Sequence, residues 1–387
     1  MMFISNVSKV AYVDPWNIPL DERIRILSKG RRRVAYFYDE ANNSTFRYRA
    51  YNMAQVLNSD DGCEVSSSYF FLRDLHLIDR IAHIADVLVI CRSLYSHRIN
   101  QLITRFRNKG KRVLFDIDDL VFDPKYAHLV INTLDLDVGD PNVWKDWFSM
   151  FARHGEVLRL CDGAITTNEF LASKLEDYSG LPAKVVPNFL NQEQIYLSEK
   201  IYREKQETNF ARDEKITVGY FSGSPSHNLD FAIITTALED IFEKDPRVEL
   251  MIVGYIEAGA ALSKYSERIK YQPFQDYINL QRLVGCVEFN LVPLQSNVFS
   301  NCKSELKYFD AAVVGTNSIV SPSYTYSSAI QDGRNGYIAQ AHQWASVLSR
   351  AIDNMADYSE MAAIAYDDAH SKFSWKTQCE SIIQAVF

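Results

Sequence analysis

The sequence has little of what marks several large classes of protein. Its six cysteines, at positions 63, 91, 161, 286, 302 and 379, show no paired spacing of the metal-binding kind. No segment approaches the ~20 consecutive apolar residues of a membrane span, and residues 1–7 lack the basic start and apolar core of a signal peptide. We therefore expect a cytoplasmic globular protein with reduced thiols.

Net positive charge is also absent. The chain carries 49 acidic and 41 basic residues, a formal net charge of −8, which argues against nucleic acid as a partner. Basic residues do cluster at 31–33 and 105–112. Either cluster suits a peripheral contact with anionic lipid on the inner face of the cell membrane or an ordinary solvated surface, and both options stay open.

What the sequence does contain is a repeated alternation of short apolar runs with helical segments. Strands are predicted at 33–38, 85–91, 112–115, 163–167 and 184–188, and again at 216–221, 248–254, 269–271, 289–294 and 319–320. Strands spaced by helices form parallel sheets with right-handed crossovers, so the fold class is α/β. Residues 191–214 are polar and charged, which predicts a linker between domains at 1–190 and 215–370, with a last helix in 371–387.

The segment 301–310, Asn-Cys-Lys-Ser-Glu-Leu-Lys-Tyr-Phe-Asp, predicts a helix that starts near Lys303. Lys303, Lys307 and Asp310 recur on one face of that helix. The first N–H groups of a helix attract anions, and a carboxylate two turns further on accepts hydrogen bonds from sugar hydroxyls. Phosphate at one end and ribose at the other describes a nucleotide-sugar site. A solvated helix face of mixed charge is the alternative.

The strand at 216–221 ends in Ser-Gly-Ser-Pro-Ser-His-Asn. Small residues, including Gly223 and Ser224, let a pyrophosphate approach the backbone N–H groups closely. His227 stands at the start of the next helix, where it can donate to a phosphate oxygen or a sugar hydroxyl. A capping loop with a surface histidine is the alternative interpretation.

Three carboxylates, Asp116, Asp118 and Asp119, follow the buried strand at 112–115. Like charges this close raise one another's pKa, and such clusters occur where protons or metals are handled. The string resembles the nucleophile motif of haloacid dehalogenase-type phosphatases, the metal motif of GT-A glycosyltransferases, and an Asp-Ile-Asp-Asp-Leu string in the first domain of many GT-B polysaccharide enzymes. A structural role in the following turn is a further alternative.

Two more candidates lie in loops. Arg47 and Arg49 stand in a glycine-free polar segment that enters a helix, where they either meet an anionic group in the cleft or pair with Asp39 or Glu40. Tyr326 either stacks on a base or packs as an ordinary aromatic residue.

The chain resembles the family 4 glycosyltransferases, retaining enzymes with the GT-B fold, over roughly residues 33–370. The helix near Lys303 resembles their donor-binding helix, in which two glutamates are usual; Asp310 stands at the second and Cys302 at the first. The third interpretation of the aspartate string fits the whole chain and places Asp118 and Asp119 in the cleft. In the loop at 222–228, His227 substitutes for the basic residue of the family.

The resemblance implies two Rossmann-like domains facing each other across a cleft, with the last helix crossing back to the first domain. It implies transfer of a hexosyl or deoxyhexosyl group from a nucleotide-diphosphate sugar to a glycan or lipid-linked acceptor in surface polysaccharide synthesis (O-antigen, capsule or S-layer glycan). Retention without a metal or other cofactor is expected. With the motifs above, the residues assigned are Asp118, Asp119, His227 and Lys307 for catalysis, Gly223, Ser224, Lys303, Ser304, Asp310 and Tyr326 for the donor, and Arg47 and Arg49 for the acceptor.

Two other functions are kept. Cys302 and the glycine-free first loop favour a non-catalytic module that binds a sugar nucleotide or serves as a scaffold in a larger synthase. A phosphatase with Asp116 as nucleophile is the more distant alternative.

Overall fold

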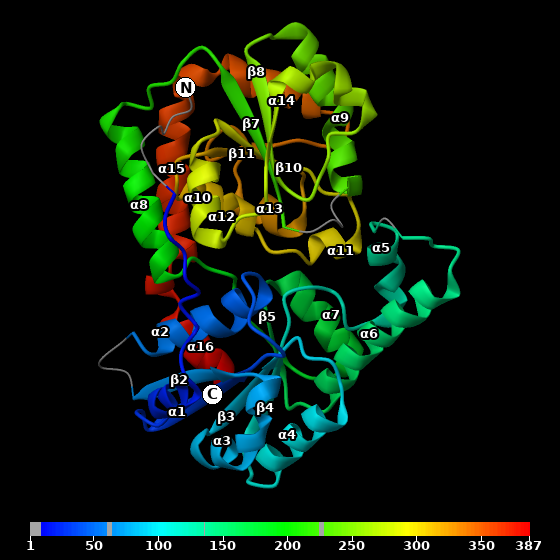
Figure 1. Cartoon of the computed structure of the whole chain (residues 1–387), viewed down its shortest axis with the longest axis vertical. Coiled ribbons are helices and arrows are strands. Elements are labelled where there is room, and N and C mark those ends of the chain that lie inside the picture. The colour runs from blue at the N-terminus through cyan, green and yellow to red at the C-terminus, as the bar shows by residue number, and fades with distance from the viewer. Residues whose placement is uncertain (1–8, 60–63, 135, 224–227) are drawn as a thin grey trace.

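Two parallel sheets of six strands each, flanked by helices, lie one above the other in the computed structural model (Figure 1). The structure describes residues 9–59, 64–134, 136–223 and 228–387. No helix in these ranges is long and apolar enough to cross a membrane. One apolar cluster runs through both domains, and a second fills the other face of the first sheet.

The first sheet has the strand order β2-β1-β3-β4-β5-β6 with parallel pairing throughout. Its strands are β1 (Arg32–Phe37), β2 (Val65–Phe70), β3 (Val87–Cys91), β4 (Arg112–Asp116), β5 (Ala164–Thr166) and β6 (Ala183–Val185). Only β2 lacked a predicted strand. Its three central serines hide its apolar character, although they are buried and Ser66 and Ser67 donate to backbone carbonyls.

The helices of the first domain connect these strands and cover both faces of the sheet. They are α1 (Leu20–Leu27), a π-helical turn (Arg47–Tyr51), α2 (Asn52–Leu57), α3 (Ile78–Ile84), α4 (His97–Arg107), α5 (Ala127–Ile131), α6 (Pro141–Arg159) and α7 (Glu169–Ser179), with short 3-10 helices at Leu72–Leu77 and Pro124–Tyr126.

The second sheet has the order β12-β11-β10-β7-β8-β9, again parallel. Numbered from β7, this is the Rossmann order. Its strands are β7 (Ile216–Ser222), β8 (Val248–Gly254), β9 (Ile269–Gln272), β10 (Phe289–Val292), β11 (Asn317–Val320) and β12 (Tyr337–Ile338). Its helices are α9 (Asn228–Lys244), α10 (Tyr277–Gly285), α11 (Val298–Asn301), α12 (Leu306–Ala312), α13 (Tyr324–Ala329), α14 (Trp344–Asp353) and α15 (Tyr358–Phe373), with 3-10 helices at Ala260–Arg268 and Met355–Asp357.

The segment predicted as a polar linker contains helix α8 (Gln192–Glu207). Asn191 caps it by accepting from the backbone N–H of Gln194 at 2.9 Å. Ile195 and Ile201 are buried on its inner face, and α8 packs against α10. Charged residues outnumber this narrow apolar stripe, which explains why composition alone indicated a linker.

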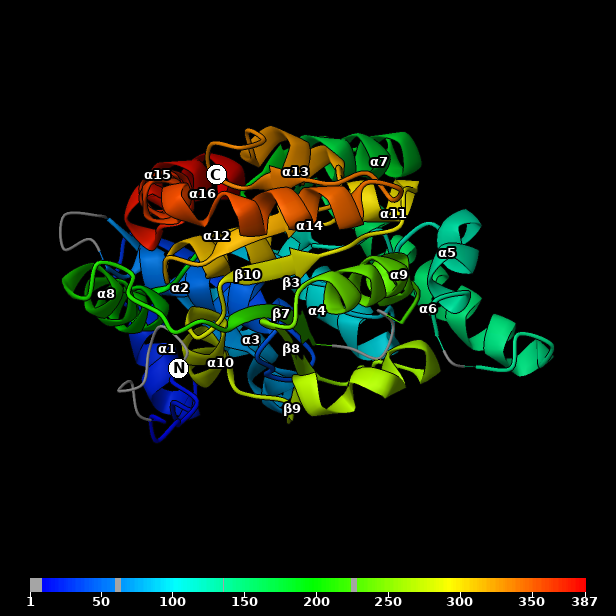
Figure 2. The same cartoon turned by 90° about the horizontal axis from the view of Figure 1, so that it is seen from above.

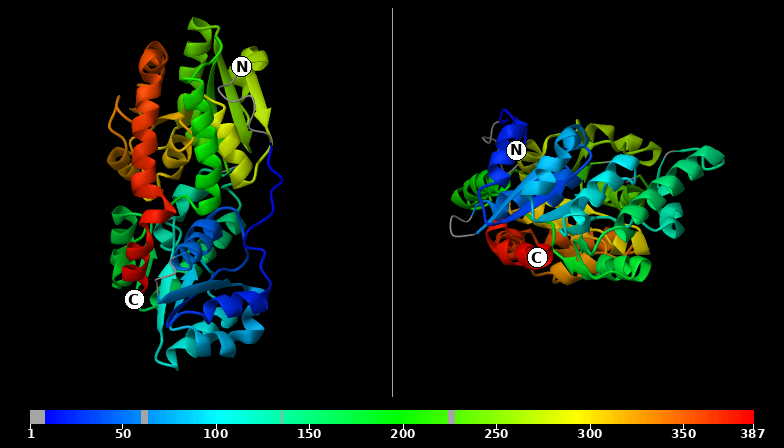
Figure 3. Two further views of the ribbon diagram at one scale, coloured as in Figure 1. Left: turned by 90° about the vertical axis from the view of Figure 1, so that its left-hand side faces the viewer. Right: turned by 90° about the horizontal axis from the view of Figure 1, so that it is seen from below.

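The chain crosses between the domains at two adjacent places. The N–H of Leu190 donates to the carbonyl of Phe373 at 2.8 Å, and the N–H of Trp375 donates to the carbonyl of Leu190 at 2.9 Å. Beyond this point a 3-10 turn (Trp375–Thr377) leads into α16 (Cys379–Val386), which packs on α2 and β6 of the first domain. Figure 3 shows this last segment running from one domain down to the other.

Candidate functional site

A cavity of about 450 Å³ lies between the two domains, with walls from both. It faces the carboxyl ends of the strands, where open α/β sheets bind ligands. A wider surface hollow of about 650 Å³ is lined by Arg212, Asp213, Glu214 and Arg247. These residues precede β7 and β8, at the opposite ends of the strands, so the interdomain cavity is the candidate site.

On the first-domain side, the guanidinium of Arg92 holds two carboxylates together. Its Nη1 donates to Asp118 at 3.1 Å and to Asp119 at 3.0 Å. Thr45 donates its hydroxyl to the other oxygen of Asp118 at 2.9 Å. All four residues line the cavity. The expected position of Asp118 and Asp119 in the cleft is what the structure shows, and their charge is shared with a cation from the neighbouring strand.

Sequence reasoning missed Arg92, whose only signal was its place directly after a predicted strand. Its φ of 41° is uncommon for a residue with a side chain. His154 of α6 lies beneath it, with Nδ1 3.0 Å from the carbonyl of Val121 and Nε2 3.2 Å from that of Arg92. Burial lowers the pKa of His154 to about 4, so this imidazole is neutral at pH 7 and braces the backbone of the cavity wall.

Asp116 does not belong to the cavity, although it is close to Asp118 in sequence. Both of its oxygens accept from Arg49, at 2.7 and 2.9 Å, and Arg49 also donates to the carbonyl of Val186 at 2.7 Å. Both side chains are at most 1% exposed. Burial raises the pKa of Asp116 to about 6 against the opposing effect of Arg49. A nucleophilic Asp116 is therefore inaccessible to a substrate.

The expectation that Arg47 and Arg49 face the cleft is wrong. Arg49 is used by Asp116, as described above. Arg47 is also buried: its Nη1 donates to Gln194 of α8 at 2.7 Å, and its guanidinium lies 4.4 Å from the centre of the Tyr277 ring on α10. The suggested pairing with Asp39 or Glu40 is likewise not what occupies them. Both arginines join elements inside the protein because the π-helical turn directs them inward.

On the second-domain side, the predicted helix is broken in two. Helix α11 ends at Asn301 and α12 begins at Leu306, so no helix begins at Lys303. Asn297 caps the short α11 by accepting from the N–H of Ser300 at 2.9 Å, and residues 302–305 form the turn between the helices. Lys303 and Ser304 therefore reach the cavity from a turn, and Lys307 reaches it from the first turn of α12.

These residues form a partly charged, partly unpaired side of the cavity. The Nζ of Lys303 lies 4.0 Å from Asp119 across the cavity and 4.8 Å from the centre of the Phe299 ring. Burial lowers the pKa of Lys307 to about 8, against the opposing charge of Asp230. Within the described residues, Ser304 Oγ and Glu305 Oε2 are buried without a hydrogen-bond partner. Burial raises the pKa of Glu305 to about 7.

Asp310 lies behind the cavity wall. One of its oxygens accepts from Gln194 and Gln281, at 3.2 and 3.3 Å, and the other accepts from the hydroxyl of Tyr48 at 3.4 Å. Burial raises its pKa to about 6. Tyr48 lines the cavity, so it stands between Asp310 and any ligand there. The ribose-binding role of Asp310 stays a prediction.

The remaining predicted residues are distributed as follows. Gly223 and Tyr326 line the cavity, and Thr325 beside Tyr326 donates to the carbonyl of Lys303 at 2.8 Å. Ser224 and His227 lie outside the described residues. Cys302 is fully buried, and its carbonyl accepts from Asn168 of the first domain at 2.9 Å. In the described ranges, no group of three or more His, Cys, Asp and Glu side chains is arranged to hold a metal ion.

No family model and no curated protein matches the sequence. Solved structures do resemble it. HepE of Anabaena, in complex with UDP and glucose, has a TM-score of 0.60 at 13% identity over 91% of this chain and 98% of its own. Sucrose-phosphate synthase from Thermosynechococcus elongatus gives 0.60 at 12% identity, covering 92% and 98%. WaaG, a glycosyltransferase involved in lipopolysaccharide biosynthesis, gives 0.58 at 12%, covering 91% and 99%.

These neighbours are GT-B glycosyltransferases, and the similarity extends over nearly all of each chain. At such low identity it shows the fold, and it leaves family 4 membership as a prediction. The predicted architecture is confirmed: this chain has the GT-B fold, with two Rossmann-like domains facing each other across a ligand-sized cavity.

Proposed function

We propose that the protein is a glycosyltransferase that moves a sugar from a nucleotide-diphosphate sugar to a glycan or lipid-linked acceptor. The main support is the interdomain cavity, where Lys303 and Lys307 line one domain and Asp118 and Asp119 line the other. Cations suit a diphosphate and carboxylates suit hydroxyl groups. UDP is the first nucleotide to test, because HepE has been solved with UDP-glucose and TarM with UDP.

In this proposal the second domain binds the donor. Lys303, Lys307 and the unpaired hydroxyl of Ser304 contact the diphosphate. Charge grows on the diphosphate as its bond to the sugar breaks, and fixed cations in a partly dry site stabilise that charge strongly. The lowered pKa of Lys307, about 8, leaves it protonated at neutral pH, and a bound anion raises this pKa further.

The first domain positions the acceptor. Asp118 and Asp119 accept hydrogen bonds from acceptor hydroxyls, and Arg92 and Thr45 hold both carboxylates in place. The acceptor oxygen forms a bond to the anomeric carbon, the bond from that carbon to the diphosphate breaks, and the hydroxyl proton leaves with the diphosphate. Following the family resemblance, the proposal includes retention of configuration, no metal, and a role in surface polysaccharide synthesis.

The experiment has two stages. A thermal-shift screen with UDP, GDP, dTDP and CMP sugars identifies the donor, because a ligand that binds only the folded state raises the melting temperature. Release of the nucleotide from that donor is then measured with glycan and lipid-linked acceptors. Asp118→Asn should reduce turnover at least tenfold and leave donor affinity unchanged, whereas Asp310→Ala should weaken donor binding. Full activity in both variants would remove these site assignments.

A non-catalytic nucleotide-sugar-binding module is the second candidate. It is favoured by Cys302, which is buried where the family carries its first glutamate, and by Asp310, which is held by two glutamines behind Tyr48. Donor binding without nucleotide release under any acceptor condition would support this candidate, and turnover would exclude it.

A further inference from the structure

One wall of the interdomain cavity differs in chemistry from the rest. Leu129, Val130 and Leu134, on α5 and just after it, line this wall together with Trp147 of α6. They belong to the same domain as Asp118 and Asp119. The first domain therefore presents both a carboxylate pair and an apolar wall to the same space, and the cations lie on the opposite domain.

The apolar surface continues outward along α6. Figures 1 and 2 both show α5 and the first half of α6 projecting from the side of the molecule as an arm. Trp144 lies one helical turn before Trp147, so the two side chains share a face. The Trp144 ring packs against Phe148 at 6.0 Å and its N–H donates to the carbonyl of Val138 at 2.8 Å.

Large apolar side chains remain exposed on this arm. Phe148 is 41% exposed, Leu136 44% and Val138 49%. Scattered exposed apolar residues are ordinary on a protein surface. These lie close together at the mouth of a cavity whose wall is also apolar, and exposed apolar patches of that kind mark binding surfaces. The track from Leu134 and Trp147 to Phe148 is called the arm track below.

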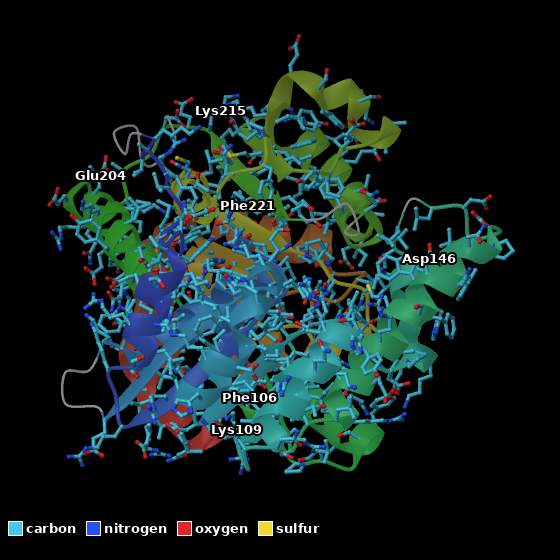
Figure 4. The ribbon with its side chains drawn as sticks, turned by 60° about the horizontal axis from the view of Figure 1, so that its bottom comes forward. Phe106, Lys109, Asp146, Glu204, Lys215 and Phe221 are labelled. Carbon is cyan, nitrogen blue, oxygen red and sulfur yellow. The ribbon has the colours of Figure 1, made fainter. Side chains whose placement is uncertain are left out.

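The charges around the arm track restrict what can occupy it. Asp137, Asp140 and Asp146 lie on this arm, with Lys145 as their basic neighbour, and Asp146 lies on the projecting part of α6 (Figure 4). An anionic membrane surface attracts basic segments, so this acidic arm is unsuited to one. An uncharged hydrocarbon chain fits both the apolar track and its acidic border.

We infer that the acceptor is an amphiphile, a hydroxyl-bearing sugar headgroup joined to a hydrocarbon chain. This inference rests on the proposed function and names its acceptor class. The headgroup lies beside Asp118 and Asp119, and the chain leaves the cavity along the arm track. Removal of apolar surface from water supplies the affinity, at roughly fourfold for each methylene that becomes fully buried.

Alkyl maltosides test the chain site directly. Maltose and its octyl, decyl and dodecyl glycosides are titrated below their micelle concentrations against the full chain saturated with UDP, and binding is followed by calorimetry. We expect affinity to rise severalfold with each added pair of methylenes. Trp147→Ser should flatten this dependence at least tenfold at the longest chain, and Trp147→Phe should restore most of it.

The control variant is Tyr196→Ser on α8, which removes another exposed aromatic residue (64% exposed) far from the arm in sequence and should bind like the wild type. Thermal melting of each variant verifies that it is folded. Affinity independent of chain length, or equal binding by Trp147→Ser and the wild type, would overturn the inference.

Two further readouts separate the possible causes of failure. Neutral phosphatidylcholine vesicles without glycolipid should not sediment the protein; sedimentation that Phe148→Ser abolishes would identify the arm as a membrane dock and overturn the acceptor assignment. UDP binding is measured in the same samples. Intact UDP binding without a chain effect refutes this inference alone, whereas absent nucleotide binding refutes the proposed function.

Discussion

At the scale of single residues, Lys307 shows how burial sets chemistry. Its amino group lies 5.2 Å from the centre of the Tyr220 ring, and burial lowers its pKa to about 8. A diphosphate requires the protonated form. UDP affinity should therefore be constant below pH 7 and fall by up to tenfold per pH unit above about pH 8.

Calorimetric titration of UDP from pH 6 to 9 measures this dependence. Lys307→Arg should bind UDP at pH 9 almost as at pH 7, because a guanidinium stays protonated. Lys307→Met should bind at least tenfold more weakly throughout and lose the pH dependence in this range. A wild-type affinity that does not change between pH 7 and 9 would exclude Lys307 from the phosphate site.

Glu305 makes a second prediction through stability. Its pKa is raised from 4.5 to about 7 by burial, and one of its oxygens has no described partner. The folded protein thus holds this proton more tightly than the unfolded chain, so stability from this group falls as the pH rises from about 4.5 to 7. Glu305→Gln should raise the free energy of unfolding by about 2 kcal/mol at pH 8 and change it little at pH 5.

Urea unfolding at the two pH values checks the prediction for Glu305→Gln. An equal effect at both pH values, or a loss of stability at pH 8, would show that the carboxylate is satisfied by a contact that the structure does not contain.

The sequence predicted the cavity-lining position of Lys303, Lys307, Asp118 and Asp119, because these residues lie at the ends of strands that sequence patterns mark clearly. It could not predict Arg92, since the partner of a lone arginine depends on which strands become neighbours. The turn between α11 and α12 breaks the single helix face from which the role of Asp310 was predicted.

At the scale of elements, the Arg49–Asp116 pair ties the π-helical turn to β4 and to the residues after β6. Removing one partner leaves a buried charge without compensation, which typically costs 3–5 kcal/mol (roughly). Arg49→Met should therefore lower the free energy of unfolding by about this amount. The double variant Arg49→Met/Asp116→Leu should recover most of the loss, because no charge remains buried.

Chemical denaturation of the wild type, both single variants and the double variant gives the coupling between the two residues. A double variant as unstable as the sum of the two single variants would contradict the pairing.

Buried parallel strands were the elements most visible in the sequence, because such strands read as continuous apolar runs. Strand β8 was predicted with the bounds observed, 248–254. Strand β2 and helix α8 were not predicted as such. Buried serines with backbone partners and a narrow apolar stripe among charges carry little local signal, and tertiary packing determines both elements.

At the scale of the whole molecule, α16 joins the end of the chain to the first domain. Ile382, Ala385 and Val386 are buried there, and the ring of Phe387 lies 3.5 Å from the guanidinium carbon of Arg32. Truncation after Ser374 should expose the face of α2 and β6. We expect a lower melting temperature and separate unfolding transitions for the two domains.

Scanning calorimetry of the truncated chain tests this expectation. Phe387→Ala, which removes the cation–π contact and leaves α16 in place, is the matched control and should cost about 1 kcal/mol or less. One unchanged transition in the truncated protein would show that α16 contributes nothing to the union of the domains.

The two-domain plan was predictable from the alternation of strands and helices, but the closeness of the two cavity walls was not. The approach of Lys303 to Asp119 and the bond from Asn168 to Cys302 join residues more than a hundred positions apart. Such contacts follow from how the two finished domains pack, and local sequence patterns do not contain that information.

The central claim is that a nucleotide diphosphate binds between the domains. A crystal structure of the protein with UDP tests it most directly. The account predicts that the diphosphate oxygens lie within hydrogen-bond distance of Lys303, Ser304 and Lys307, with the carboxylates of Asp118 and Asp119 across the cavity. Density for UDP at another surface, or a cavity that stays closed by its own side chains at saturating UDP, would contradict it.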